Sequence, residues 1–172
     1  MEDVASTSEV VIRDAEREDM LEVDKMIQEL AVYEKLTDDA RLNAADLVRD
    51  GFDSPAAFGC KVLEVRGEQR VVAGYALYYR TYSTCVGRGL MLEDLYVRER
   101  WRRRGFGRRL FAAVAAEAVS RGCARLELHV LSWNPARAFY EARGAVDLSD
   151  ADWRYYRLDA EQLRRAALLH TL

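Results

Sequence analysis

The sequence lacks any apolar run long enough to cross a membrane, and it is poor in cysteine. No stretch reaches the roughly 18 consecutive apolar residues that a membrane-spanning helix requires. The cysteines, Cys60, Cys85 and Cys123, are odd in number and widely spaced. This pattern argues against a disulfide framework and against a cysteine zinc site. We therefore expect a protein of a reducing compartment that holds no metal ion.

The sequence also lacks a secretory signal, an internal repeat, a low-complexity segment and a linker. Its first residues, MEDVASTSEV, are acidic and polar, whereas a signal peptide begins with a basic segment followed by an apolar one. This predicts a cytoplasmic protein. The 172 residues are enough to bury a core, and we expect them to form one domain, residues 1–172.

An excess of one charge is absent as well, because the net charge is −3 although 32% of the residues are charged. The chain as a whole is therefore not built to bind a polyanion such as a nucleic acid. Positive charge is instead gathered locally, with six arginines between Arg100 and Arg109. A local cluster of this kind favours a small anionic ligand.

The arginine cluster follows an apolar segment, residues 90–97, whose length and composition predict an interior β-strand. Two acids, Glu93 and Asp94, interrupt this segment, and successive strand residues point to opposite faces of a sheet. A buried carboxylate without a partner is costly, or its pKa rises. The two acids are a solvated bulge, a salt-bridged pair or, as we favour, a carboxylate placed to accept a proton.

Two glycines, Gly105 and Gly107, follow the arginines, and the apolar spacing after them predicts a helix over residues 108–121. Arginines destabilise the start of a helix, which is already electropositive. Free N–H groups, glycine conformations and arginines together are typical of a phosphate-binding loop. The third glycine of the dinucleotide fingerprint and the Gly-Lys-Ser/Thr of a P-loop are absent. A solvated basic helix start is the alternative.

Other segments show the periodicity of helices and strands. Helices are predicted over residues 17–34 and over residues 44–50, the second capped by Asn43 and stopped by Gly51. Asn134 as N-cap and Pro135 as first residue predict a helix that Gly144 ends. The remaining predicted elements are strands 10–12, 58–65, 71–82, 126–131 and 153–158, and a helix over 161–169.

Four tyrosines crowd the predicted strand 71–82. We interpret Tyr75, Tyr78, Tyr79 and Tyr82 first as packing residues, one or two of which could form the floor of an amine pocket. His129, one of two histidines in the chain, is interpreted as a residue on the surface of a strand.

The segment Arg102-x-x-Gly105-x-Gly107 after a hydrophobic strand resembles the acyl-CoA loop of the GNAT acetyltransferases, whose pattern is Gln/Arg-x-x-Gly-x-Gly/Ala. More narrowly, the sequences LEDLYV, WNP and FY at residues 92–97, 133–135 and 139–140 resemble the spermidine/spermine and thialysine N-acetyltransferase group. The likeness runs from about residue 10 to residue 158. It implies an α/β GNAT fold, with a mixed, mostly antiparallel sheet flanked by helices.

The resemblance also implies acetyl-CoA as co-substrate. It implies that Leu95 and Val97 hydrogen-bond the pantetheine arm as if it were an added strand, and that Asn134 contacts the same cofactor. The loop residues that it assigns to the cofactor, chiefly to the pyrophosphate, are Arg102, Arg103, Arg104, Gly105, Phe106, Gly107 and Arg108, with Tyr96 on the preceding strand.

Acetyl transfer to an amine requires that the ammonium group first lose a proton. For a lysine-like pKa near 10.4, this costs roughly 4.6 kcal/mol at pH 7. We expect Glu93 to be the base and Asp94 to be a second contact to the amine. The resemblance implies that Tyr140 also touches the cofactor and protonates the leaving thiolate. A tyrosine on a short helix can equally be a packing residue.

The resemblance places further residues around the acceptor amine. Tyr33, Glu34, Ser83 and Trp153 are implied as substrate contacts together with Asp94, and an exposed glutamate at a helix end is the alternative for Glu34. The polyamine enzymes carry an acid at the position of Ser83, and its loss here favours thialysine over spermidine and spermine. The group also builds its amine pockets partly from a partner chain, which implies a homodimer.

Other functions remain open from the sequence alone. The acceptor could be a protein or peptide amine. The chain could also be a non-catalytic acyl-CoA sensor or an RNA-binding module. The nearly neutral charge disfavours RNA, and the pair Glu93 and Tyr140 disfavours a sensor, because binding alone requires neither.

Overall fold

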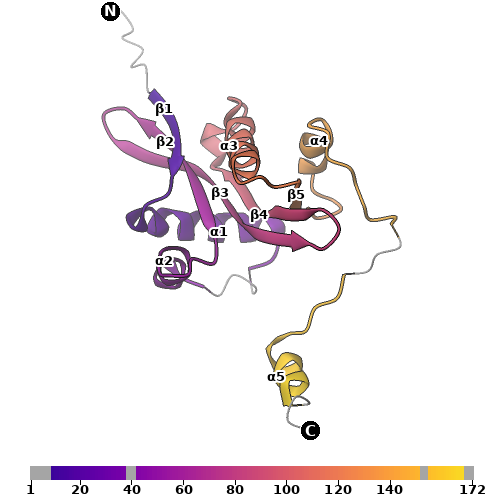
Figure 1. Ribbon diagram of the computed structural model, residues 1–172. Coiled ribbons are helices and arrows are strands. Elements are labelled where there is room, and N and C mark those ends of the chain that lie inside the picture. The colour runs from indigo at the N-terminus through magenta and orange to yellow at the C-terminus, as the bar shows by residue number, and fades with distance from the viewer. Residues whose placement is uncertain (1–8, 38–41, 152–154, 169–172) are drawn as a thin grey trace, which may run out of the picture. The chain divides into compact units, whose positions relative to one another are not determined.

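The computed structural model describes residues 9–37, 42–151 and 155–168. The chain divides into two compact units, one ending at Leu131 and the other beginning at Ser132. The first unit contains, in order, β1 (Glu9–Asp14), the 3-10 turn η1 (Arg17–Asp19), α1 (Met20–Glu34), α2 (Ala44–Phe52), β2 (Gly59–Arg66), β3 (Arg70–Ser83), β4 (Gly87–Val97), the turn η2 (Glu99–Trp101), α3 (Phe106–Ser120) and β5 (Arg125–Leu128) (Figure 1). The second unit contains α4 (Ala136–Glu141) and α5 (Ala160–Leu168).

The strands form one mixed sheet in the order β1-β2-β3-β4-β5. The pairs β1/β2, β2/β3 and β3/β4 are antiparallel, and the pair β4/β5 is parallel. A parallel pair needs a crossover connection, and α3 lies in the connection between β4 and β5. The predicted mixed, mostly antiparallel sheet with flanking helices is confirmed.

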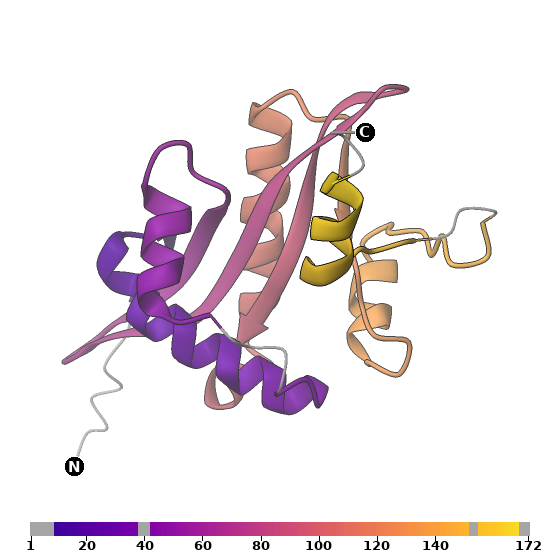
Figure 2. The ribbon, with the colours of Figure 1, turned by 90° about the horizontal axis from the view of Figure 1, so that it is seen from below.

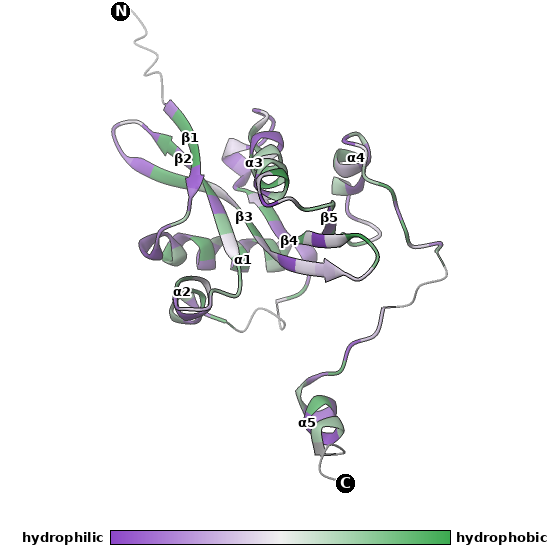
Figure 3. Cartoon of the chain, in the orientation of Figure 1, coloured by the Kyte–Doolittle hydropathy of each residue, from purple (hydrophilic) through white to green (hydrophobic). Residues whose placement is uncertain are grey.

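Helices cover both faces of the sheet, with α1 and α2 on one face and α3 on the other (Figures 1 and 2). Hydrophobic and hydrophilic residues alternate along α1, as expected for a helix with one buried side (Figure 3). The core on the α1 face contains Met20, Val23, Met26, Leu47, Cys60, Val62, Val72, Tyr75, Leu77 and Tyr96. In the described residues, no helix is long and apolar enough to cross a membrane.

The short helix α2 begins as predicted but ends later. The Asn43 side chain accepts hydrogen bonds from the amides of Ala45 and Asp46, as an N-cap does. The prediction that Gly51 stops the helix is wrong, because the helix continues to Phe52. A Cβ at position 51 would lie 2.5 Å from the ring of Phe58. The glycine is therefore explained by the close approach of this ring and not by a helix end.

Two of the predicted strands near the C-terminal end of the chain differ from the structure. The expected strand over residues 153–158 is not found in the described residues 155–158, which pair with no strand there. A strand requires a pairing partner, and the alternating composition of this segment does not supply one. Trp153 lies outside the described residues. The predicted strand 126–131 is also shorter than expected, because β5 ends at Leu128.

Candidate active site

A β-bulge at Glu93 organises the centre of β4. Leu92 pairs with Tyr78 and Asp94 pairs with Leu77, so Glu93 is an extra residue between two consecutive partners. Tyr78 faces the α3 side, where the Arg121 guanidinium lies 5.6 Å from its ring centroid. Leu77 belongs to the core on the α1 face. The bulge therefore turns Leu92 toward α3 and Asp94 toward α1, although the two positions would share one face in a regular strand.

Glu93 itself is exposed. A bulge was one of the alternatives for these two acids, and the structure contains it, but neither Glu93 nor Asp94 forms a salt bridge among the described residues. Bulges are common beside active sites, where they redirect side chains. The bulge is therefore compatible with a solvated acid and with a proton acceptor.

The two parallel strands separate at the same place. β4 pairs with β5 only from Gly89 to Leu92, while β4 continues to Val97. In the described part of the chain, the edge of β4 from Glu93 onward therefore has no strand partner on the β5 side. Leu95 and Val97, the predicted contacts to pantetheine, lie on this segment, and an extended ligand can pair with such an edge.

Asp94 is partly buried and contacts one buried hydroxyl. Tyr75 of β3 is fully buried, and its hydroxyl donates a hydrogen bond to Asp94 Oδ2 at 3.0 Å. The pKa of Asp94 is raised to about 6, because burial and the charges of Glu93 and Glu34 raise it more than the hydrogen bond from Tyr75 lowers it. Asp94 is therefore an acid whose charged form is poorly compensated.

Glu34 ends α1, and Lys35 follows it in the left-handed conformation with φ 60°. Burial raises the pKa of the Glu34 carboxyl. Its charge acts on both Asp94 and Tyr75, so the end of α1 lies near the bulge. We call Glu34, Glu93 and Asp94 the carboxylate cluster. In the described residues, none of the three forms an ion pair, and no metal-binding group of His, Cys, Asp and Glu is found.

Arg102, a predicted cofactor contact, turns its side chain back toward β4. Its Nε donates to the carbonyl oxygen of Val97 at 2.7 Å. Its guanidinium lies 5.7 Å from the ring centroid of Tyr33 and 5.3 Å from that of Tyr96. The side chain thus connects the end of α1 to the end of β4, which the sequence pattern did not reveal.

The remaining loop arginines are exposed. Arg103 has φ 61° and Gly105 has φ 76°, and left-handed backbone at a non-glycine residue is often found at functional sites. Arg104 stacks on Trp101, with 5.0 Å between its guanidinium and the ring centroid. Gly105 precedes α3, so Phe106, Gly107 and Arg108 form its first turn, whose N–H groups are free to bind an anion.

Ser83, a predicted substrate contact, has a structural role. Its Oγ accepts hydrogen bonds from the amides of Cys85 and Val86 at 3.2 and 3.4 Å, and this stabilises the turn between β3 and β4. Serine at such a position is a turn signal that the sequence already contained.

Asn134 and Tyr140 belong to the second unit. Asn134 is buried, and its Oδ1 accepts a hydrogen bond from the amide of Ala136 at 2.9 Å. The prediction of Asn134 as N-cap and Pro135 as first residue is wrong by one position, because α4 begins at Ala136 and Pro135 is its N-cap. Tyr140 lies on α4, where its ring meets that of Phe139 edge-to-face with 5.1 Å between centroids.

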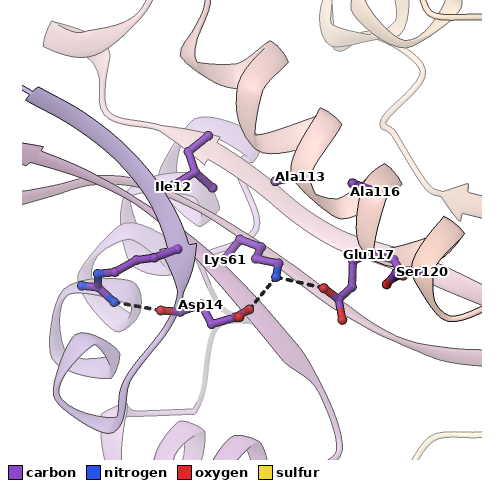
Figure 4. A pocket seen from close by; sticks show the side chains of 8 residues that line it. Ile12, Asp14, Lys61, Ala113, Ala116, Glu117 and Ser120 are labelled. Carbon is purple, nitrogen blue, oxygen red and sulfur yellow. Dashed lines mark hydrogen bonds and ion pairs between the residues drawn. The ribbon is translucent and has the colours of Figure 1, made fainter.

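A cavity of about 420 Å³ lies elsewhere, on the α3 side of β1 and β2 (Figure 4). It is lined by Ile12, Arg13, Asp14, Lys61, Ala113, Ala116, Glu117 and Ser120. Lys61 forms ion pairs with Asp14 at 2.6 Å and with Glu117 at 2.9 Å. These three charged side chains of the cavity are therefore already paired with one another. None of the lining residues belongs to the carboxylate cluster or to the arginine-rich loop.

The chain is similar to known acetyltransferases in sequence. The model of the acetyltransferase (GNAT) family matches residues 19–145. A thialysine N-epsilon-acetyltransferase of Bos taurus is 40% identical over 165 residues, 92% of this chain and 97% of that protein. A spermidine/spermine N(1)-acetyltransferase-like protein 1 of Homo sapiens is 37% identical over 88% of this chain and 23% of that protein.

Solved structures show a similar fold at lower sequence identity. An integron cassette protein from V. cholerae superposes with a TM-score of 0.71 at 24% identity, over 92% of this chain and 97% of that chain. An aminoglycoside N-acetyltransferase in complex with CoA superposes with a TM-score of 0.66 at 17% identity, over 91% of this chain and 99% of that chain.

Proposed function

This chain belongs to the acetyltransferase (GNAT) family and is an N-acetyltransferase; from that premise we propose its acceptor, its cofactor contacts and its catalytic residues. The acceptor is the primary amine of a small lysine-like or polyamine substrate, with thialysine favoured and spermidine and spermine next. The thialysine and spermidine/spermine names of its relatives support this class. Membership of the family also sets aside the non-catalytic alternatives, the acyl-CoA sensor and the RNA-binding module.

The carboxylate cluster is the single observation that carries the proposed acceptor. Asp94 has a pKa raised to about 6 by burial, and neighbouring Glu34 and Glu93 add negative charge. Three acids near one another without a cation among the described residues are electrostatically incomplete. An ammonium group supplies the missing positive charge, and it favours the ionised form of each carboxyl group.

GNAT acetyltransferases use acetyl-CoA, and one solved neighbour contains CoA. We assign the phosphates to Arg103, Arg104 and Arg108 together with the free N–H groups at the start of α3. The edge of β4 from Glu93 to Val97 receives the pantetheine arm. Further contacts are assigned to Tyr96, Arg102, Gly105, Phe106, Gly107, Asn134 and Tyr140.

Glu93 and Tyr140 are assigned the two proton transfers. Glu93 accepts a proton from the ammonium, and the neutral nitrogen attacks the carbonyl carbon of the thioester. Backbone N–H groups beyond Asp94 stabilise the oxyanion. The C–S bond then breaks, and the Tyr140 hydroxyl protonates the thiolate. The second proton lost by the nitrogen restores Tyr140, Glu93 releases its proton to water, and the products are the N-acetylated amine and CoA.

Tyr33, Glu34, Ser83, Asp94 and Trp153 are assigned to the acceptor. We also assign residues 1–172 to one catalytic domain, because the family match at residues 19–145 extends across the boundary between the two units. A cytoplasmic homodimer completes the proposal. The apolar residue Leu163 of α5, 58% exposed, is available for such contacts. Light scattering distinguishes a dimer from the 19.7 kDa monomer.

Release of free thiol from acetyl-CoA tests the acceptor. We expect kcat/KM to be highest with thialysine, lower with spermidine, putrescine and lysine, and lowest with a histone peptide. The matched control is acetylated thialysine, which has no free side-chain amine at the reacting position. Turnover with the peptide alone, or no turnover with any amine, would contradict the proposal.

A further inference from the structure

Tyr75 places a polar atom in an apolar part of the core. Its side chain is 0% exposed and lies among the hydrophobic residues between the sheet and α1. A buried hydroxyl without a hydrogen-bond partner destabilises a protein. The partner is Asp94 Oδ2, 3.0 Å away. Packing alone would be served by phenylalanine, so the hydroxyl requires a separate explanation.

The surroundings of Asp94 supply that explanation. The ionisable groups that act on it are Tyr75 of β3, Glu93 of β4 and Glu34 of α1, and the Cys60 thiol of β2 lies close enough to respond to its charge. None of these groups is a cation. Among them, the Tyr75 hydroxyl alone favours the charged carboxylate, while burial and both glutamates oppose it.

The rigidity of Tyr75 adds a geometric argument. Its ring packs against the ring of Tyr96 with 6.4 Å between centroids, and the Tyr96 hydroxyl donates to Glu29 of α1 at 3.0 Å. The donor is thus fixed by β3, β4 and α1 together. A fixed donor holds one oxygen of Asp94 and leaves the other oxygen to a ligand.

We propose that Tyr75 is a positioning residue for the acceptor amine: its buried hydroxyl orients Asp94 and keeps it ionised to receive the substrate ammonium. This inference rests on the proposed amine acetylation and identifies a residue outside the motifs that indicate the family. Tyr75 itself touches neither substrate nor cofactor.

The direction of the pH effect follows from the hydrogen bond. The bond from Tyr75 lowers the pKa of Asp94, which still stands at about 6. Without the hydroxyl the pKa rises further, and a larger fraction of Asp94 is protonated near neutral pH. Amine binding should therefore weaken most at pH 6–7 and recover at pH 9, where Asp94 is ionised with or without Tyr75.

Tyr75→Phe is the decisive variant, because it removes the hydroxyl and keeps the ring. We expect KM for the amine to rise on the order of 10-fold at pH 6.5, as expected for a hydrogen bond to a charged group. KM for acetyl-CoA should stay unchanged, and the acid limb of kcat/KM should move to higher pH. Tyr78→Phe is the matched control, because Tyr78 is 2% exposed on the same strand but faces α3.

A double-mutant cycle separates this role from a structural one. In the Asp94→Asn background, Tyr75→Phe should change KM for the amine by less than about 2-fold, because no charge remains to be stabilised. An equal loss of kcat/KM at every pH, or the same loss in Tyr78→Phe, would overturn the proposal.

Carbon NMR of the aspartate carboxyl groups tests the link without any substrate. In the wild-type protein, the Asp94 carboxyl, identified by its absence in Asp94→Asn, should titrate near pH 6 and the Tyr75 ring signals should titrate with it. In Tyr75→Phe the midpoint should rise. Independent titration of the two residues in the wild type would overturn the proposal even if the variant does not fold. Failure of all amines as acceptors would instead contradict the proposed function and leave this measurement valid.

Discussion

Two acids on the same sheet, Glu64 fully buried and Asp94 partly buried, differ in whether a cation lies beside them. Glu64 of β2 is 2% exposed and accepts contacts from Arg13, Arg66 and Arg70 at 2.7, 2.6 and 2.7 Å. Asp94 of β4 has the hydroxyl of Tyr75 and, among the described residues, no cation. Burial disfavours the charged form of both carboxyl groups, so the difference in partners is what sets them apart.

The two carboxyl groups respond in opposite directions. Burial favours the neutral form of Glu64, but hydrogen bonds and charge from the arginines lower its pKa to about 2. The pKa of Asp94 is about 6, because burial raises it and the Tyr75 hydroxyl offsets the rise only in part. A folded chain gains stability from the first arrangement. The second arrangement lowers stability, and the proposed ammonium substrate would offset that loss.

The largest expected effect distinguishes the exposed Glu93 of the carboxylate cluster from the partly buried Asp94. Glu93→Gln should lower kcat/KM at pH 7 by about 10²- to 10⁴-fold, the usual range for a general base. Part of the rate should return as pH rises, because free amine then becomes available. The measurement is kcat/KM from pH 6 to 9, with Asp94→Asn alongside. If Glu93→Gln stays within a few-fold of wild type while Asp94→Asn shows the pH-dependent recovery, Asp94 is the base.

The second effect concerns the paired acid. Glu64→Gln leaves the arginines around it without their central charge and should destabilise the fold by about 3 kcal/mol. The folded pKa of Glu64, about 2, lies below its ordinary 4.5. The loss should therefore be complete above about pH 4.5 and should shrink as pH falls toward 2. Urea unfolding at pH 7 and at low pH measures both quantities.

The control for Glu64 is an exposed ion pair. Asp53→Asn removes a contact to Arg17 in which the two side chains are 57% and 50% exposed. Its effect should stay below about 1 kcal/mol. Equal losses in the two variants would mean that burial does not strengthen the Glu64 network.

The smallest effect has the opposite sign. Asp94→Asn removes an uncompensated charge and retains an oxygen that accepts the Tyr75 hydrogen bond, so it should stabilise the fold at pH 8 by about 1 kcal/mol. A carboxyl whose folded pKa is raised costs stability above that pKa, here about 6. The advantage of the variant should therefore be smaller at pH 5 than at pH 8. Lower stability of Asp94→Asn at pH 8 would show that the charge is compensated by groups not described here.

The sequence predicted those parts of the candidate site that depend on residues adjacent in the chain. The strand carrying Glu93 and Asp94, the glycines of the loop and the helix that ends at Glu34 each have a local pattern. The hydrogen bond from Tyr75 to Asp94 has none, because its partners come from different strands.

The difference between local patterns and contacts from other parts of the chain also explains two wrong predictions of secondary structure. Gly51 resembles a helix stop in sequence, yet the ring of Phe58 accounts for it. Residues 155–158 have the composition of a strand but no strand partner among the described residues. Ser83 and Arg102 are not among these errors: their contacts to ligands stay predictions, and the structure adds that the first accepts hydrogen bonds in a turn and the second donates one to Val97. In the two errors, at Gly51 and at residues 155–158, contacts outside the local pattern decided the outcome.

The extra residue at position 93 makes the length of β4 as important as its composition. A substitution there changes one side chain, whereas a deletion would restore regular alternation between Leu92 and Asp94. Leu92 and Asp94 would then keep their partners Tyr78 and Leu77 and the opposite faces that they already occupy, whereas one residue more or fewer elsewhere in β4 would move the residues beyond it to the other face of the sheet. A library for directed evolution should therefore exclude insertions and deletions in the rest of β4, and it should retain Glu93 where activity is selected, because we assign a proton transfer to that side chain.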